Sequence, residues 1–344
     1  MNLVYLLSSF TITGAALLLL KPIAHKVGLV DIPGGRKTHL SATPLVGGLG
    51  IFLGIITISF LMPGVSAQFA PLLSLSALIL FIGTVDDAKE LTPFARMLGH
   101  GLVALAMAVV AGVELRSLGA LVTQNSISLG ALTLPVTVFA TVGVINAINM
   151  ADGVDGLSGG LVIVTLGFIS LLAFAAGQTI TGSFCLIMIC SIAAFLGLNF
   201  RQPWHKKALV YLGDAGSTML GFMLAWLLIT NTQGANPSFA PVYALWFLAV
   251  PLFDTVNLLI KRPLRGRSPF APGTDHLHHM LLSRGLSVKQ VVALLLCSAI
   301  TLGGAGYIGN YLGASESLMF QLFIVLFCLY FYFSDRIEKK PSHC

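Results

Sequence analysis

Long apolar stretches, separated by short connections rich in Gly, Pro and polar residues, recur along the whole chain. A helix needs about 20 mostly apolar residues to cross a bilayer, and turn residues mark where each stretch ends. The pattern predicts an all-α polytopic membrane protein, a single domain over residues 1–344 with about eleven transmembrane helices. These are expected over residues 3–20, 45–62, 70–85, 97–113, 134–151, 158–176, 180–199, 215–231, 241–260, 290–309 and 315–334.

The distribution of basic residues predicts the orientation of these helices in the membrane. With the N-terminus outside, 18 of the 19 Lys and Arg residues fall on every second connection, and only Arg116 lies on the other side. The positive-inside rule makes those connections cytoplasmic, so the C-terminus is also expected in the cytoplasm. The cytoplasmic segments are then about 21–44, 86–96, 152–157, 200–214 and 261–289, with a short tail over 335–344.

Two further segments are expected on the outer side. The first crossing has no Lys or Arg before Lys21, unlike a secretion signal, so it is expected to be a retained helix. Polar and apolar residues alternate in 114–133, which predicts a small external hairpin.

Composition narrows the class of protein. Hydrophobic residues make up 56% of the chain and charged residues 9%, whereas soluble domains have about 25% charged residues. A soluble globular, disordered or collagen-like protein is therefore excluded. The net charge is +6, but no block of five or more basic residues occurs, so no nucleic acid partner is expected. The five Cys residues include no CxxC pair and predict neither a disulfide framework nor a zinc site.

Ionisable residues gather on one side of the predicted topology. All eight His residues lie on or near the cytoplasmic side, as do eleven of the thirteen acids, with Glu114 and Glu316 as exceptions. The positive-inside rule gives Asp and Glu little weight, so it does not explain this distribution. The active site is therefore expected at the cytoplasmic membrane face.

Three acidic motifs stand at the ends of predicted crossings. They are the VDDA pair, the NAINMADGVDGLSGG stretch and the GDAGST segment, with Asp86, Asp87, Asn149, Asp152, Asp155 and Asp214. Each acid taken alone could cap a helix or face solvent. Acids at a membrane boundary are functional more often than not, and together these form a set of oxygen ligands. Such a set favours Mg²⁺ or Mn²⁺ over zinc.

Basic motifs accompany the acids on two cytoplasmic loops. The larger loop carries a run of arginines followed by HLHH, and the first loop carries further basic residues near a Gly/Pro-rich segment. The candidates are Arg262, Arg265, Arg267, His276, His278, His279, Arg36 and His39. Arginines bind phosphate in a bidentate manner, although topology alone could account for them. It does not account for HLHH, nor for Asp254 within the ninth predicted crossing.

Carboxylates for a hard cation, basic groups for phosphates and an apolar body together indicate phosphoryl transfer to or from a membrane lipid. Neither a P-loop GxxxxGK[ST] nor a GxSxG serine motif occurs in the sequence. An ion-coupled secondary transporter is the alternative from another class. Transporters place such groups near the bilayer midplane, between internal repeats, whereas these acids gather at one face.

The motifs resemble those of the polyprenyl-phosphate N-acetylhexosamine-1-phosphate transferases. VDDA, NAINMADGVDGLSGG, GDAGSTMLGF and DHLHH occur in that family's order, and the match covers almost the whole chain. Four motifs in register make the resemblance specific. HLHH and PLFD look like the WecA-type bacterial branch, which makes undecaprenyl-diphospho-GlcNAc, whereas the phospho-MurNAc-pentapeptide branch carries a different histidine loop.

The resemblance implies an activity and a location. GlcNAc-1-phosphate would pass from UDP-GlcNAc to undecaprenyl phosphate with release of UMP, as the first membrane step of cell-surface polysaccharide synthesis. The enzyme would lie in the bacterial inner membrane, use Mg²⁺ or Mn²⁺, and form a homodimer. Another UDP-sugar with GalNAc, FucNAc or QuiNAc, or UDP-MurNAc-pentapeptide, remains an alternative donor.

The resemblance also implies residue roles. Asp86 would be the general base, Asp87 and Asp152 would support the catalytic site, and Asp214 and Asn149 would bind Mg²⁺. Substrate binding would involve Asp155 at the uracil, together with Asn149, Arg262, Arg265, Arg267, His276, His278, His279, Arg36 and His39.

Overall fold

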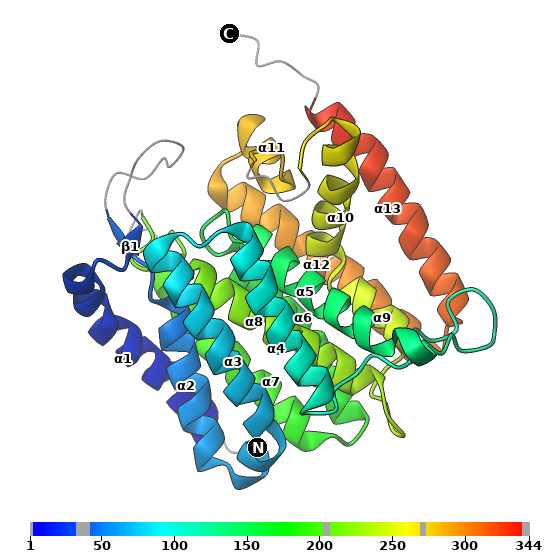
Figure 1. Cartoon of the computed structure of the whole chain (residues 1–344), viewed down its shortest axis with the longest axis horizontal. Helices are drawn as coiled ribbons and strands as arrows, with labels where there is room; N and C mark the ends of the chain where they lie inside the picture. Colours follow the sequence, from blue (N-terminus) through cyan, green and yellow to red (C-terminus); the bar gives the residue numbers. More distant parts are fainter. Residues whose placement is uncertain (1–2, 32–41, 202–206, 269–272, 339–344) are drawn as a thin grey trace.

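The computed structural model describes residues 3–31, 42–201, 207–268 and 273–338 of the chain. Helices form almost all of its regular structure (Figure 1). They are α1 (Leu3–Val27), α2 (Gly47–Leu61), α3 (Pro63–Lys89), α4 (Pro93–Val109), the 3₁₀ turn η1 (Gly130–Leu132), α5 (Thr133–Met150), α6 (Leu157–Ala175), α7 (Thr179–Asn199), α8 (Gly213–Thr232), α9 (Pro241–Phe247), α10 (Ala249–Leu264), α11 (Leu277–Ser283), α12 (Val288–Tyr311) and α13 (Glu316–Glu338). A two-residue ladder pairs β1 (Val30–Asp31) with β2 (Thr43–Pro44).

The helices confirm a polytopic all-α membrane protein. Within the described residues, eight helices are long and apolar enough to cross a membrane, and α9 with α10 form a ninth candidate bent by 86°. The apolar helices α2 and α4 are shorter than this length. Each stretch predicted to cross is helical over most of its length, and the bend lies inside the ninth. The count of eleven crossings itself stays a prediction.

Helix α8 forms the centre of the bundle. It packs against α2, α3, α5, α6 and α9, and nearly all of its residues are buried. Its sequence is less apolar than the peripheral helices, yet it is the most enclosed, because neighbours rather than lipid surround it. The polar residues at its start are therefore carried into the middle of one end of the molecule.

A close backbone approach sets α3 against α8. A Cβ atom on Gly83 would collide with the backbone of Ala215, so no side chain larger than hydrogen fits there. Gly83 lies nearly two turns before the end of α3, and Ala215 lies in the first turn of α8. The missing side chain lets the end of α3 and the start of α8 touch, which brings their acids together.

The hairpin expected within residues 114–133 is present, and its position on the outer side stays a prediction. Residues Ser117 and Ser128 form an isolated antiparallel bridge, and backbone N–H groups of Leu118, Ile127 and Leu129 donate across it. At its base, the Oε1 of Gln233 accepts from the backbone of Arg116 and Ser117 at 3.1 Å each. The hairpin lies at the opposite end of the bundle from α11 (Figure 1).

Candidate active site

The acid pair lies where α3 turns into α4. Glu90 ends α3 with a left-handed φ of 51°, and Thr92 caps α4 just before Pro93. Thr92 and Pro93 are the residues expected at the start of a helix, whereas a left-handed conformation is uncommon for a residue such as Glu90. Asp86 stabilises the turn, because its Oδ1 accepts from the backbone N–H of Leu91 at 2.7 Å.

Asp87 binds the first turn of α8 from outside that helix. Its Oδ1 accepts from the N–H of Asp214 at 2.8 Å, and its Oδ2 accepts from the N–H of Ala215 at 3.1 Å. A carboxylate at a helix N-terminus is worth about 1 kcal/mol. Gly213 makes the contact possible: its φ is 75°, and an added Cβ would crowd the Asp87 carboxylate.

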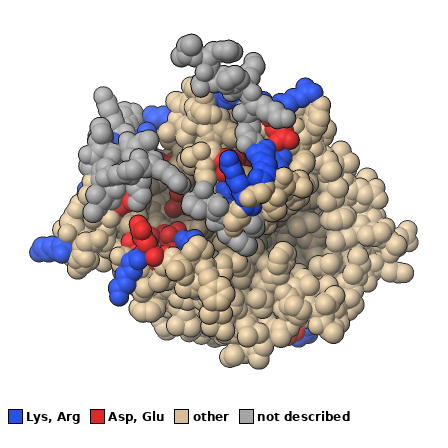
Figure 2. All heavy atoms as spheres, turned by 45° about the horizontal axis from the view of Figure 1, so that its top comes forward, with Lys and Arg blue, Asp and Glu red and all other residues tan. Residues whose placement is uncertain are grey.

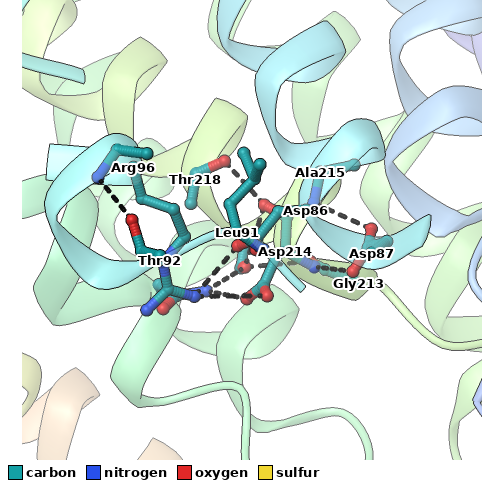
Figure 3. A network of polar contacts seen from close by, with 12 residues as sticks. Asp86, Asp87, Leu91, Thr92, Arg96, Gly213, Asp214, Ala215 and Thr218 are labelled. Carbon is teal, nitrogen blue, oxygen red and sulfur yellow. Dashed lines mark hydrogen bonds and ion pairs between the residues drawn. The ribbon is translucent and has the colours of Figure 1, made fainter. Parts of the chain in front are cut away.

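Arg96 joins the two acidic motifs (Figure 3). Its Nη1 lies 2.9 Å from Oδ2 of Asp86 and 3.5 Å from Oδ2 of Asp214. The Asp86 side chain is 4% exposed, whereas those of Arg96 and Asp214 are 33% and 35% exposed. Both oxygens of Asp86 are therefore engaged inside the protein, while Asp214 and Arg96 reach the surface.

Asn149 supports Asp214 from α5. Its amide nitrogen donates to Oδ1 of Asp214 at 2.6 Å and to the hydroxyl of Ser217 at 3.0 Å. This orientation leaves the Asn149 amide oxygen without a hydrogen bond within the described chain. The structure thus brings the predicted pair of metal ligands into contact, from helices 65 residues apart.

Asp152 and Asp155 lie on the loop between α5 and α6. Burial, together with the nearby Asp214, Asp87 and Asp155, raises the pKa of Asp152 well above its usual value. Asp155 is paired instead: its Oδ2 lies 2.6 Å from Nε of Arg201. Among the described residues the Asp152 carboxylate accepts no hydrogen bond, which distinguishes it from the other acids of the cluster.

The oxygen atoms of this cluster fit a magnesium ion. Mg²⁺ takes one or two protein carboxylates and completes its shell with water and substrate phosphates. Asp214 offers a partly exposed carboxylate, and Asn149 a free amide oxygen beside it. No group of three or more His, Cys, Asp or Glu side chains in the described residues could enclose a metal ion. These residues would therefore supply only part of the coordination shell, and water and substrate phosphates would supply the rest.

The predicted arginines of the large loop are largely engaged with acids. Arg262 is 3% exposed and donates from Nε and Nη2 to both oxygens of Asp275. Arg265 lies 3.0 Å from Asp335 of α13. Arg267 is exposed on the surface. Arg262 therefore holds the loop together, and its predicted contact with substrate stays a prediction.

The three histidines lie in different environments at the start of α11. His276 and His278 are buried, whereas His279 is partly exposed. Burial lowers the pKa of His278 to about 3 and also lowers the pKa of His279. Both are neutral near pH 7, so they can donate to phosphate only as neutral imidazoles.

His278 connects the histidine segment to the acid cluster. Its ring packs on Gly153, where a Cβ would collide with it. Gly153 follows Asp152, so the loop of α5 and α6 and the start of α11 are in direct contact. The acids and the histidines consequently form one continuous site at one end of the bundle.

Figure 2 shows the surface of that end. Charged atoms gather over it, while the flank of the molecule visible below is almost free of them. Arg36 and His39, predicted to bind substrate, lie outside the described residues. The sequence pattern assigns Arg96 and Arg201 only to the cytoplasmic set of Lys and Arg residues, although both pair with predicted site acids. Only their places at the ends of apolar stretches beside acidic motifs could have suggested this.

Comparison of the sequence with known proteins places the chain in a family. The sequence model described as "Glycosyl transferase family 4" matches residues 69–232. An undecaprenyl-phosphate alpha-N-acetylglucosaminyl 1-phosphate transferase of Yersinia pestis is 37% identical over 328 residues, covering 95% of this chain and 90% of the relative. This chain belongs to glycosyl transferase family 4. Proteins with the same name from Salmonella typhi and Escherichia coli (strain K12) are 37% and 35% identical, each covering 97% of this chain and 91% of the relative.

Membership of glycosyl transferase family 4 confirms the resemblance drawn from the four motifs. The matched segment contains every acid of the cluster, from Asp86 to Asp214. It ends at the last residue of α8, so the histidine segment lies beyond it. The residue roles that the resemblance implied stay predictions.

Proposed function

We propose that this protein transfers GlcNAc-1-phosphate from UDP-GlcNAc to undecaprenyl phosphate, giving undecaprenyl-diphospho-GlcNAc and UMP. The relatives that carry this activity in their names align over nearly the full chain. The observation that carries the proposal is the contact of the acid cluster with the histidine segment through Gly153 and His278. This contact supports the proposal because it joins the carboxylates to the histidines that are proposed to bind phosphate.

The topology that suits this reaction has eleven crossings, with the site at the cytoplasmic face of the bacterial inner membrane. The start of α1 and the end of α13 lie at opposite ends of the bundle (Figure 1), which supports an odd number of crossings. The short helices α2 and α4 and the bent pair α9–α10 complete the count. The N-terminus is then outside and the C-terminus cytoplasmic. A homodimer also stays a prediction.

The chemistry is proposed as direct displacement. An oxygen of the lipid phosphate attacks the sugar-bearing phosphorus of UDP-GlcNAc, the bond to the UMP oxygen breaks, and UMP leaves. Asp86 is proposed to accept the proton of the lipid phosphate. For this, Arg96 has to exchange its contact with Asp86 for one with the phosphate, and its partial exposure allows that. Asp214 and Asn149 would hold Mg²⁺, which neutralises charge on the diphosphate when bound.

A groove between α4 and α5 is proposed to hold the polyprenyl chain. It has a volume of about 620 Å³, and its lining is almost wholly apolar. It begins at Met97, which follows Arg96 in α4, and extends to Leu134 and Pro135 at the start of α5. The side chains that line it also include Leu98, Leu102, Leu105, Val138, Phe139 and Val142. A polyprenyl chain that lies in this groove would have its phosphate beside Arg96.

Gly101→Trp tests the groove. Gly101 lines it, and a Cβ there meets no atom within 4 Å, so the indole should fill the groove without unfolding the helix. The KM for undecaprenyl phosphate is expected to rise about tenfold, equivalent to excluding about two methylene groups. The KM for a short-chain polyprenyl phosphate should change much less.

Gly304→Trp is the matched control, because Gly304 of α12 also has open space around it and does not line the groove. It should leave both constants unchanged. An equal effect of Gly101→Trp on long and short acceptors would contradict the groove assignment.

The proposed function is tested with purified protein in detergent. Undecaprenyl phosphate is combined with UDP-GlcNAc or another UDP-sugar, with Mg²⁺, with Mn²⁺ or with EDTA, and UMP is measured. Metal-dependent UMP from UDP-GlcNAc is the expected result. UMP from a different UDP-sugar alone would keep the reaction and change the donor. Folded protein that releases no UMP from any donor would contradict the proposal and favour an ion-coupled transporter.

A further inference from the structure

A single buried carboxylate outside the acid cluster holds the start of α11. Asp254 of α10 is 8% exposed. Its Oδ1 accepts from the backbone N–H of Leu277 at 2.9 Å and from the hydroxyl of Tyr330 at 3.2 Å. Its Oδ2 lies 2.9 Å from Nδ1 of His276. Asp254 thus joins α10, α11 and α13 at one point.

Asp254 orients the His276 ring through Nδ1. A carboxylate can only accept, so the proton between the two groups lies on Nδ1, which donates to Asp254. On the other side of the ring, Nε2 lies 3.5 Å from Nη2 of Arg262. Asp275 holds Arg262 from its other side through two hydrogen bonds. Both ring nitrogens of His276 are consequently used within the protein.

The other two histidines are not held in this way. His278 is 3% exposed against Gly153, and its Nε2 has no partner in the described chain. His279 is partly exposed at the surface of the same turn. Of the three histidines, His279 is therefore the one that reaches the surface.

We propose that Asp254 is a positioning residue for the transferase reaction, which fixes His276 with its proton on Nδ1 and thereby leaves His279 as the histidine that contacts the donor diphosphate. The inference rests on the proposed function, because it assumes that the sugar nucleotide binds beside α11. Within it, His276 acts through its Nδ1–H and not as a phosphate ligand through Nε2.

Two amide substitutions separate these roles of His276. In His276→Asn, the side-chain amide nitrogen lies near the position of Nδ1 and can still donate to Asp254. In His276→Gln, the amide nitrogen lies near the position of Nε2 and the contact with Asp254 is lost. We expect kcat/KM for UDP-GlcNAc to stay within about fivefold of wild type in His276→Asn. It should fall about 100-fold in His276→Gln, the size of effect expected when reacting groups are misplaced by about 1 Å.

The coupling to Asp254 is measured with a double variant. Asp254→Asn keeps one acceptor oxygen, so the amide nitrogen must face either the Nδ1–H of His276 or the N–H of Leu277, donor against donor. Either mismatch releases the start of α11, so a loss similar to that of His276→Gln is expected. If the two residues act as one unit, Asp254→Asn/His276→Gln should lose no more than either single variant. Additive losses would overturn the proposed pairing.

His279 supplies a further readout. His279→Ala should raise the KM for UDP-GlcNAc about tenfold, as for one lost hydrogen bond to a charged group, with a smaller change in kcat. An unchanged KM would remove His279 from the donor site and overturn that part of the proposal.

The reversed order, with His276→Gln active and His276→Asn inactive, would show that Nε2 binds the donor and would overturn the inference. Equal losses in two folded variants would also overturn it. Gel filtration and thermal unfolding in detergent identify folded protein, and His25→Asn with His25→Gln on the exposed end of α1 are matched controls. Absence of turnover in the wild type would instead count against the proposed function.

Discussion

Asp214→Asn is expected to reduce kcat by about 10³-fold or more, the range over which charge neutralisation acts in phosphoryl transfer. The change keeps the shape of the side chain and removes its charge. Asp214 is the acid that combines partial exposure with contacts to both Asn149 and Arg96. Loss of its charge should therefore weaken binding of the divalent ion. It should also leave Arg96 with Asp86 as its remaining carboxylate partner among these acids.

The measurement is UMP release as a function of Mg²⁺ concentration. Along with the lower kcat, the Mg²⁺ concentration that gives half-maximal rate should rise. Glu114→Gln is the matched control, because it removes a carboxylate from outside the acid cluster, beside the hairpin, where Glu114 pairs with Arg116. Its rate and Mg²⁺ dependence should equal those of wild type. Wild-type Mg²⁺ dependence in Asp214→Asn would show that the ion is held elsewhere.

Asp86→Asn is expected to lower kcat by about 10²- to 10⁴-fold, the contribution usual for a general base. The asparagine still accepts from the N–H of Leu91, so the turn between α3 and α4 should persist. Arg96 loses its closer ion-pair partner, so thermal unfolding must be measured in parallel. The distinguishing result is the pH profile of kcat: its acidic limb should disappear with the group that must be ionised.

Asp152 is the competing candidate for the base. Burial and neighbouring acids raise its pKa, so ionising it costs more free energy in the folded than in the unfolded protein. The unfolded chain releases this proton above its ordinary pKa of 3.8, and stability then falls as the pH rises towards the folded value. Asp152→Asn cannot ionise. It should be at least as stable as wild type at pH 7, and the difference should vanish below pH 3.8.

The two variants together decide the base. If Asp152→Asn loses the acidic limb of the profile and Asp86→Asn keeps it, the base is Asp152, and the assignment of Asp86 is wrong. Asp86 would then be a residue that positions Arg96. Asp152 would in that case lower the stability of the folded protein while it serves the reaction as the base.

The sequence predicted which residues gather, and the structure adds what each one touches. Hydrophobic length and the sorting of Lys and Arg put the acids and histidines at one end, and helix packing confirms their contact. Pairing could not be read from the chain, because Arg96 with Asp86, Arg262 with Asp275 and Asp254 with His276 depend on side-chain directions in the packed bundle.

The hydrophobic pattern also does not predict the bend between α9 and α10. Residues 241–260 are continuously apolar and read as one crossing, whereas two helices meet there at 86°. Length and composition are the same for a straight and a broken helix. Only the packing of α9 against α12 and of α10 against α5 distinguishes them.

The contact of Asp87 with the start of α8 has a consequence for how the protein is made. The two groups are 127 residues apart, so α3 leaves the ribosome long before the amides that will receive its carboxylate exist. Until then Asp87 has to stay hydrated at the bilayer surface or carry a proton. Insertion of α8 is thus the step in synthesis at which the α3 acids lose their water, and the acid cluster can be assembled only after five further α-helices, α4 to α8, have been made.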